Sequence, residues 1–111
     1  MVLQYDAALD VAVGNSRKTK TWKNKTIRWS ELVDRMAADT RTPETVAEYK
    51  AMGRNQQSEI KDVGGFVGGY CPEGNRSAVA HRSVLCLDAD FATPDLWDDW
   101  SLLFGNAAAV Y

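Results

Sequence analysis

Four glycines lie within six residues in the middle of the chain, at positions 64, 65, 68 and 69. They exclude a helix there, because each glycine costs about 1 kcal/mol relative to alanine in a helix interior. Glycine within a strand typically marks a place where another backbone approaches very closely. Residues 64–70 are therefore predicted to form a strand or loop under close backbone packing, and residues 71–75 a turn.

The segments on either side of this block predict a domain that contains both helices and strands. Ser30 and the sequence Thr42-Pro43-Glu44 are typical helix starts. The fold class expected is α/β (α+β), with a small mixed sheet and helices packed on it. The predicted elements are a strand or short helix at 3–13, a basic loop or hairpin at 17–28, helices from 30, from 42 and at 55–61, a buried central strand at 84–87, a helix from Pro94 and a strand at 107–111.

Length and cysteine content limit the domain organisation and the compartment. The 111 residues correspond to one domain, and no apolar stretch approaches the roughly 20 residues of a membrane span. Two cysteines do not make a disulfide framework or a structural zinc site. We expect a cytoplasmic, reduced protein in which Cys86 is a buried, inert thiol. Because a predicted strand runs to the last residue, we also expect residues 1–111 to be an N-terminal fragment of a longer domain.

The charge is distributed unevenly along the chain. Residues 1–30 hold six basic and two acidic residues, whereas residues 63–111 hold two basic and six acidic residues. Cations interleaved with Trp22 and Trp29 suit single-stranded DNA, whose phosphates take the charge while its bases stack on the rings. The alternative is a solvated basic hairpin with its tryptophans in the core. The candidate nucleic-acid-binding residues are Arg17, Lys18, Lys20, Lys23, Lys25 and Arg28.

Asp88 and Asp90 follow the apolar run at 84–87 and give the sharpest chemical signal. In a strand, residues two apart point to the same face, about 6.6 Å from Cα to Cα, so both carboxylates would converge. Their mutual repulsion is relieved by a divalent cation, and carboxylate oxygens suit Mg²⁺ or Mn²⁺. The alternative is a strand end whose acids meet water or cap the next helix. Just before this run, Arg82 is a candidate contact for a nucleotide phosphate, and His81 has no predicted role.

Four segments, in this order, resemble one family of replication proteins. They are RWSELV at 28–33, TRTPET at 40–45, KDVGGFVGGY at 61–70 and LCLDAD at 85–90. Together they resemble the N-terminal part of phage and integrative-element replication proteins, the virulence-associated protein E-like proteins or phage primase-helicases. The front domain of those proteins is similar to the archaeo-eukaryotic primase superfamily, the primase-polymerases. The resemblance covers nearly the whole chain.

The resemblance implies a function for the parent protein and a role for two residues. Asp88 and Asp90 match the superfamily's D-x-D motif, which implies that they bind the catalytic Mg²⁺ or Mn²⁺. The implied reaction is template-directed nucleotidyl transfer in DNA replication, with single-stranded DNA and nucleoside triphosphates as partners. The family's next motifs, a hydroxyl residue with a histidine and a further acid, do not occur before residue 111. We therefore expect a partial catalytic core that binds metal weakly and is inactive alone.

Two other functions fit the sequence. The first is a nucleic-acid-binding or protein-interaction module without metal, in which DNA binding would survive Asp88→Ala. The second is another D-x-D enzyme, such as a phosphohydrolase or a nucleotide-sugar transferase. That class would be favoured if phosphomonoesters or nucleotide sugars, rather than template and triphosphates, supported metal-dependent binding.

Overall fold

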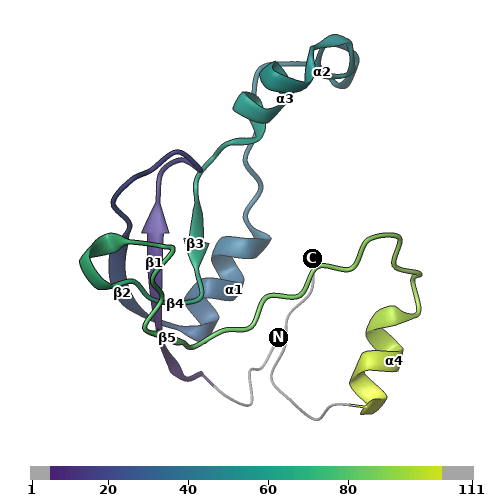
Figure 1. The fold of residues 1–111 in the computed structure, drawn as a ribbon. Coiled ribbons are helices and arrows are strands. Elements are labelled where there is room, and N and C mark those ends of the chain that lie inside the picture. The colour runs from purple at the N-terminus through teal and green to yellow at the C-terminus, as the bar shows by residue number, and fades with distance from the viewer. Residues whose placement is uncertain (1–5, 104–111) are drawn as a thin grey trace.

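The computed structural model describes residues 6–103, and the structural statements below refer to that part of the chain. It contains antiparallel sheets and four helices, which confirms the α+β class (Figure 1). In chain order the elements are β1 (Ala8–Gly14), β2 (Lys23–Arg28), α1 (Trp29–Ala37), α2 (Val46–Ala51), α3 (Arg54–Lys61), β3 (Gly65–Val67), β4 (Gly69–Tyr70), the 3₁₀ turn η1 (Pro72–Gly74), β5 (His81–Arg82) and α4 (Leu96–Leu103). Within residues 6–103 no helix is long and apolar enough to cross a bilayer.

β1 is the central strand of a three-stranded antiparallel sheet with the order β2-β1-β3. β2 pairs along nearly all of β1, beginning with Ala8 opposite Arg28. β3 pairs only with the last part of β1 and ends with Gly14 opposite Gly65. β4 and β5 form a separate two-stranded sheet. The basic segment therefore forms the loop and second strand of a hairpin, as predicted.

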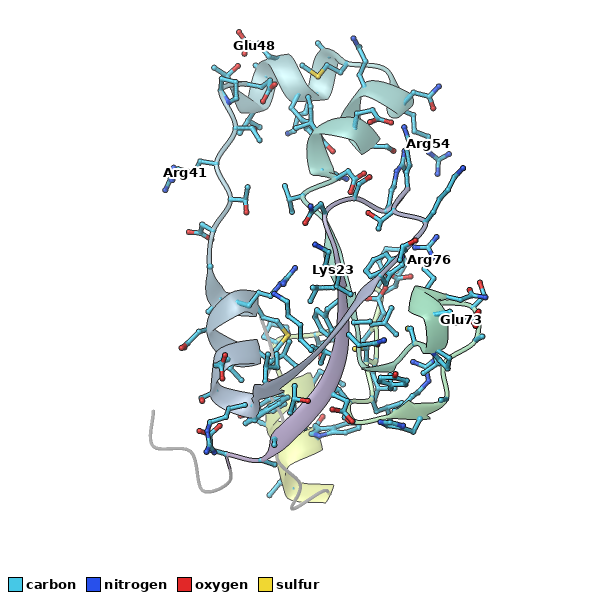
Figure 2. All side chains as sticks on the ribbon, turned by 90° about the vertical axis from the view of Figure 1, so that its left-hand side faces the viewer. Lys23, Arg41, Glu48, Arg54, Glu73 and Arg76 are labelled. Carbon is cyan, nitrogen blue, oxygen red and sulfur yellow. The ribbon has the colours of Figure 1, made fainter. Side chains whose placement is uncertain are left out.

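Both faces of the central sheet are covered. Val11 and Ala12 are adjacent in β1 and both are fully buried, although successive strand residues point to opposite faces. Figure 2 shows α1 on one side of the sheet and the turn that carries Glu73 on the other. Leu32 of α1 is fully buried, and Ala12 packs in one cluster with Trp22 and Cys71. Trp22 therefore belongs to the core, as the solvated-hairpin alternative requires.

The glycine block packs as closely as predicted. Gly64 has φ +85°, and a Cβ atom at this position would overlap the carbonyl oxygen of Gly14. A Cβ at Gly69 would overlap the carbonyl oxygen of His81 on the neighbouring strand. Between β3 and β4, the carbonyl of Gly68 accepts hydrogen bonds from the next residues after β5. Side chains at positions 64 and 69 would collide with the backbone of the neighbouring strand within each sheet.

α1 begins earlier than predicted. Its first residue is Trp29, so Ser30 lies in the first turn and is not the N-cap. Asp6, from the segment before β1, accepts hydrogen bonds from the backbone N–H of Ser30 at 2.8 Å and from its hydroxyl at 2.9 Å. These bonds hold the pKa of Asp6 below its ordinary value. A residue distant in sequence thus supplies the acceptor that Ser30 was expected to provide.

α2 and α3 form an arm that projects from the sheets (Figure 1). α2 begins at Val46, so the predicted start at residues 42–44 is wrong by a few residues. Thr45 is the N-cap: its hydroxyl accepts from the N–H of Glu48, and its own N–H donates to the Glu48 carboxylate. This reciprocal pairing satisfies two backbone donors at the helix start. α3 covers the predicted helix at 55–61 and starts one residue earlier.

The segment after β5 differs most from the sequence prediction. Residues 84–87 do not form a strand, and Leu85 and Leu87 are 76% and 65% exposed. An apolar run becomes a strand only when neighbours satisfy its backbone groups, and no strand within residues 6–103 pairs with it. α4 forms where a helix was predicted, but it stands apart from the sheets and leaves Leu96 and Trp97 exposed (Figure 1). The expectation that the helices pack on the sheet is therefore wrong for α4, and the predicted strand at 107–111 lies outside the described residues.

Candidate functional site

Asp88 and Asp90 lie in the loop between β5 and α4. Both are exposed, and the predicted placement at the end of a buried central strand is wrong. The loop has no strand neighbour within the described residues, so the strand geometry that would align the two carboxylates is absent there. Cys86 in the same loop is exposed, which contradicts the predicted buried thiol. The buried cysteine is Cys71, whose neighbours are Ala12 and Trp22.

The aspartate pair fits a divalent cation in donor type but supplies only part of a coordination shell. Among the described residues, neither carboxylate has a hydrogen-bond or ion-pair partner. Carboxylate oxygens are preferred ligands of Mg²⁺, which takes about six oxygens in near-octahedral geometry. Between residues 6 and 103, no three or more His, Cys, Asp or Glu side chains come together as a metal site. The remaining ligands would have to be water, substrate or other groups.

Two of the six candidate DNA-binding cations are neutralised by acids of the arm. The ammonium of Lys18 lies 2.5 Å from the carboxylate of Glu59, and the guanidinium of Arg17 lies 3.5 Å from the same group. Asp62 accepts from the hydroxyl of Ser16 and from the N–H of Arg17, and the hydroxyl contact is the main cause of its lowered pKa. The pKa of Glu59 is lowered mainly by Lys18. The tip of the basic hairpin is therefore tied to α3.

Three of the remaining cations are free to meet phosphate. Lys20, Lys23 and Lys25 are exposed, and within the described chain their side chains form no hydrogen bond or ion pair. Lys23 and Lys25 point to the same face of β2 because they are two residues apart in a strand. Figure 2 shows Lys23 beside the central strands. Arg28 donates to the carbonyl of Asp6 at 3.1 Å and so helps to fix the start of α1.

The two tryptophans that were predicted to stack with bases are more buried than the lysines. Trp22 is only 5% exposed, and its indole N–H donates to the carbonyl of Thr19. It therefore cannot offer a ring face to a nucleic acid. Trp29 is half-buried as the first residue of α1. Arg82, the candidate nucleotide contact, is exposed on β5 opposite Gly69.

A polar cluster on β1 was missed from the sequence. The imidazole Nε2 of His81 lies 2.9 Å from one carboxylate oxygen of Asp10, and the hydroxyl of Thr26 donates to the other oxygen at 3.0 Å. The backbone N–H of Asp10 donates to the hydroxyl of Ser83. The pKa of Asp10 is lowered mainly by the His81 bond and then by Thr26. A polar residue inside an apolar strand was the available signal, but its partner is 71 residues away.

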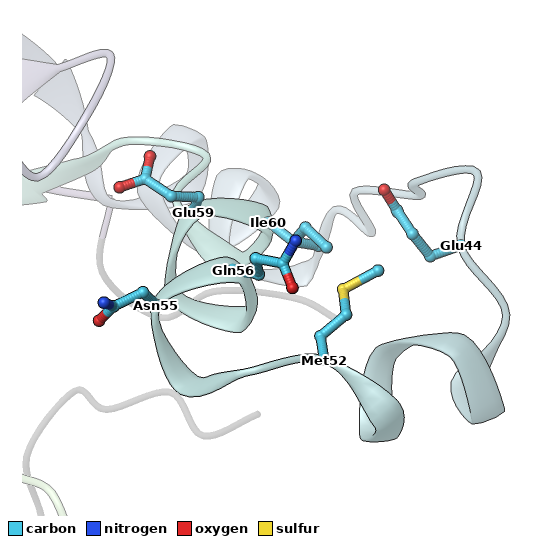
Figure 3. Close-up of a pocket in the computed structure, with 6 residues that line it drawn as sticks. All are labelled: Glu44, Met52, Asn55, Gln56, Glu59 and Ile60. Atoms are coloured by element: carbon cyan, nitrogen blue, oxygen red, sulfur yellow. The ribbon is translucent and has the colours of Figure 1, made fainter.

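An open hollow on the arm is a poor candidate for a nucleotide site. It has a volume of about 420 Å³ and lies between α2 and α3 (Figure 3). Its lining includes Glu44 and Glu59, whose carboxylates repel phosphate. The other lining residues are Met52, Asn55, Gln56 and Ile60.

A comparison with family models identifies the family of the chain. The model described as the VapE N-terminal domain matches residues 1–111. The chain belongs to the VapE N-terminal domain family. No curated protein and no solved structure matches it significantly.

The VapE match confirms the resemblance to virulence-associated protein E-like proteins across the whole sequence. Membership of the primase-polymerase superfamily stays a prediction. In this VapE domain, the glycine block joins the two sheets, and the D-x-D pair lies on the segment that leaves β5. The two motifs are thus connected through the β4–β5 hairpin.

Proposed function

We propose that this VapE domain is the front part of a DNA replication protein of a phage or related mobile element, and that it takes part in metal-dependent nucleotidyl transfer. One observation carries the proposal: Asp88 and Asp90 are exposed carboxylates without a side-chain partner among the described residues. Two such groups, two residues apart, attract a cation because no cation within residues 6–103 neutralises them. The family match over residues 1–111 supports the replication context.

In the proposed reaction, a 3′-hydroxyl on the growing strand attacks the α-phosphate of a nucleoside triphosphate, and pyrophosphate leaves. Asp88 and Asp90 would hold Mg²⁺ or Mn²⁺, which supplies Lewis-acid stabilisation of the charge that develops on the reacting oxygens. Arg82 would attract the triphosphate, and Lys20, Lys23 and Lys25 would hold the backbone of the single-stranded template.

Metal binding by the chain alone should be weak. Two carboxylates leave most of the shell to water, and Mg²⁺ releases its waters reluctantly. We expect a dissociation constant on the order of millimolar, by extrapolation from the weakest calcium modules. A bound triphosphate would add oxygens and tighten the site.

The test measures Mn²⁺ binding to the chain, with and without a nucleoside triphosphate. The electron paramagnetic resonance signal of the free ion reports how much Mn²⁺ is bound. Asp88→Asn and Asp90→Asn should each weaken binding. The double variant Asp98→Asn, Asp99→Asn removes an equally exposed acidic pair from α4 and should leave binding unchanged. In the full-length protein, either D-x-D substitution should abolish primer synthesis. Synthesis that survives both substitutions would refute the catalytic role.

A second candidate function is a non-catalytic module that binds single-stranded DNA. The free lysines Lys20, Lys23 and Lys25 favour it, because they need no metal to bind phosphate. It predicts that DNA binding persists in Asp88→Ala and that the full-length protein synthesises no primer under any metal. Mn²⁺ binding to the chain and primer synthesis by the full-length protein therefore separate the candidates.

A further inference from the structure

Tyr70 and His81 form an exposed ring pair on the small sheet. They lie opposite each other in the β4–β5 pairing. Their rings are nearly parallel, at 7°, with centroids 5.7 Å apart, which is an offset stack. Tyr70 is 41% exposed and the His81 side chain is 53% exposed. The pair therefore presents aromatic surface to solvent.

The imidazole of this pair is held in place from the central sheet. His81 bonds to Asp10 at 2.9 Å, and Asp10 in turn accepts from Thr26 of β2 at 3.0 Å and donates its backbone N–H to Ser83 at 3.1 Å. Residues of β1 and β2 and the residue after β5 thus fix the imidazole ring, which stacks on the ring of Tyr70. A ring pair that is already ordered loses little conformational entropy when a ligand stacks on it.

We propose that Tyr70 and His81 form a stacking platform for a base of single-stranded nucleic acid. The inference rests on the proposed function, since it assumes that a nucleic acid reaches this face. Ring faces accept any base, and stacking on them is a main source of single-strand affinity. Asp88 lies seven positions after His81, so the platform is at most roughly 25 Å along the chain from the D-x-D pair.

The competing explanation is that the ring pair only stabilises the β4–β5 hairpin, as cross-strand aromatic pairs do. The two roles differ in what they require of the ligand. If the pair is only structural, its loss lowers the stability of the protein and weakens the binding of every ligand alike. If the pair is a stacking platform, its loss weakens the binding of a strand that carries bases and not of one that lacks them.

The test compares two labelled oligomers of equal length by fluorescence anisotropy, one of deoxythymidine and one of abasic sugar-phosphate. Tyr70→Leu should weaken binding of the deoxythymidine oligomer at least about fivefold and leave the abasic oligomer unaffected. Tyr70→Phe keeps the ring and should bind both as the unsubstituted chain does. By contrast, loss of Lys20, Lys23 and Lys25 should weaken both oligomers alike.

Equal affinities of Tyr70→Leu and the unsubstituted chain, or equal loss on both oligomers, would overturn the stacking platform and leave the proposed function standing. No binding of either oligomer by the unsubstituted chain would overturn both proposals. A measurement on the unsubstituted chain avoids any effect of substitution on folding. The ring-proton resonances of Tyr70 and His81 should shift on titration with the deoxythymidine oligomer and not with the abasic one, and unshifted resonances would also overturn the platform.

Discussion

Replacing Lys20, Lys23 and Lys25 by alanine should change how salt weakens binding to single-stranded DNA. Each phosphate that a protein cation neutralises contributes about −0.7 to the slope of log affinity against log salt on a single strand. Six working cations would give a slope of about −4.2. In the structure Arg17 and Lys18 face Glu59 and Asp62, and Arg28 is engaged with the start of α1.

Three free lysines predict a slope of about −2.1 for the basic hairpin, and the triple alanine variant should lose nearly all of it. Fluorescence anisotropy over a series of salt concentrations measures both slopes. Lys50→Ala with Arg54→Ala removes two exposed cations from the arm and serves as the matched control, which should keep the slope of the unsubstituted chain.

The ion pairs between the basic hairpin and the arm give a further prediction for the same assay. Glu59→Gln removes the carboxylate that faces Lys18 and Arg17, so the slope should steepen by up to about 0.7 for each cation released. A triple lysine variant with the slope of the unsubstituted chain would refute the role of the hairpin. A slope near that expected for six cations would instead show that DNA displaces the acids of α3.

Three other predictions follow from packing, exposure and charge. Gly69→Ala should lower the melting temperature, because the added Cβ would overlap a backbone oxygen. At Gly53 an added Cβ meets no atom within 4 Å, so Gly53→Ala should be tolerated. Equal melting temperatures of the two variants would contradict the packing described. A thiol reagent should modify Cys86 in the native protein and spare Cys71 until unfolding, as peptide mapping would reveal. Hydrogen bonds from Ser16 and the Arg17 backbone lower the pKa of Asp62 in the folded protein below its ordinary value of 3.8. The Asp62 carboxylate therefore stabilises the fold above pH 3.8, and this stabilisation is lost as the pH falls through the lowered pKa of the folded state. Asp62→Asn should therefore make acid denaturation less steep, and an unchanged pH profile would count against this linkage.

The local elements were largely predictable because short-range chemistry determines them. The glycine block forms strands under close packing because Gly64 and Gly69 leave no room for a Cβ. Residues 17–28, predicted as a loop or hairpin, form the loop and second strand of the β1–β2 hairpin, and the predicted helix at 55–61 is present as α3. Helix starts were less accurate: Ser30 was displaced by Asp6, which reaches the helix from a distant part of the chain.

The arrangement of the candidate aspartates was not predictable from the sequence, and their role stays a prediction. The D-x-D pattern predicted that Asp88 and Asp90 share a cation because a strand would point both carboxylates to one face. Their placement on a strand was wrong, since an apolar run shows what the chain can bury and not which neighbour will cover it. The basic segment was found as a run of six cations, but its pairing with Glu59 joins residues about forty positions apart.

By itself the sequence determined the class of the domain, the approximate positions of its helices and its close-packed glycines. These depend on backbone geometry and on side-chain chemistry within a few positions. Only the tertiary structure decided that Trp22 is core, that two of the six cations are neutralised, and that His81 meets Asp10. Those outcomes depend on contacts between distant segments, and no periodicity or spacing along the chain encodes which segments will meet.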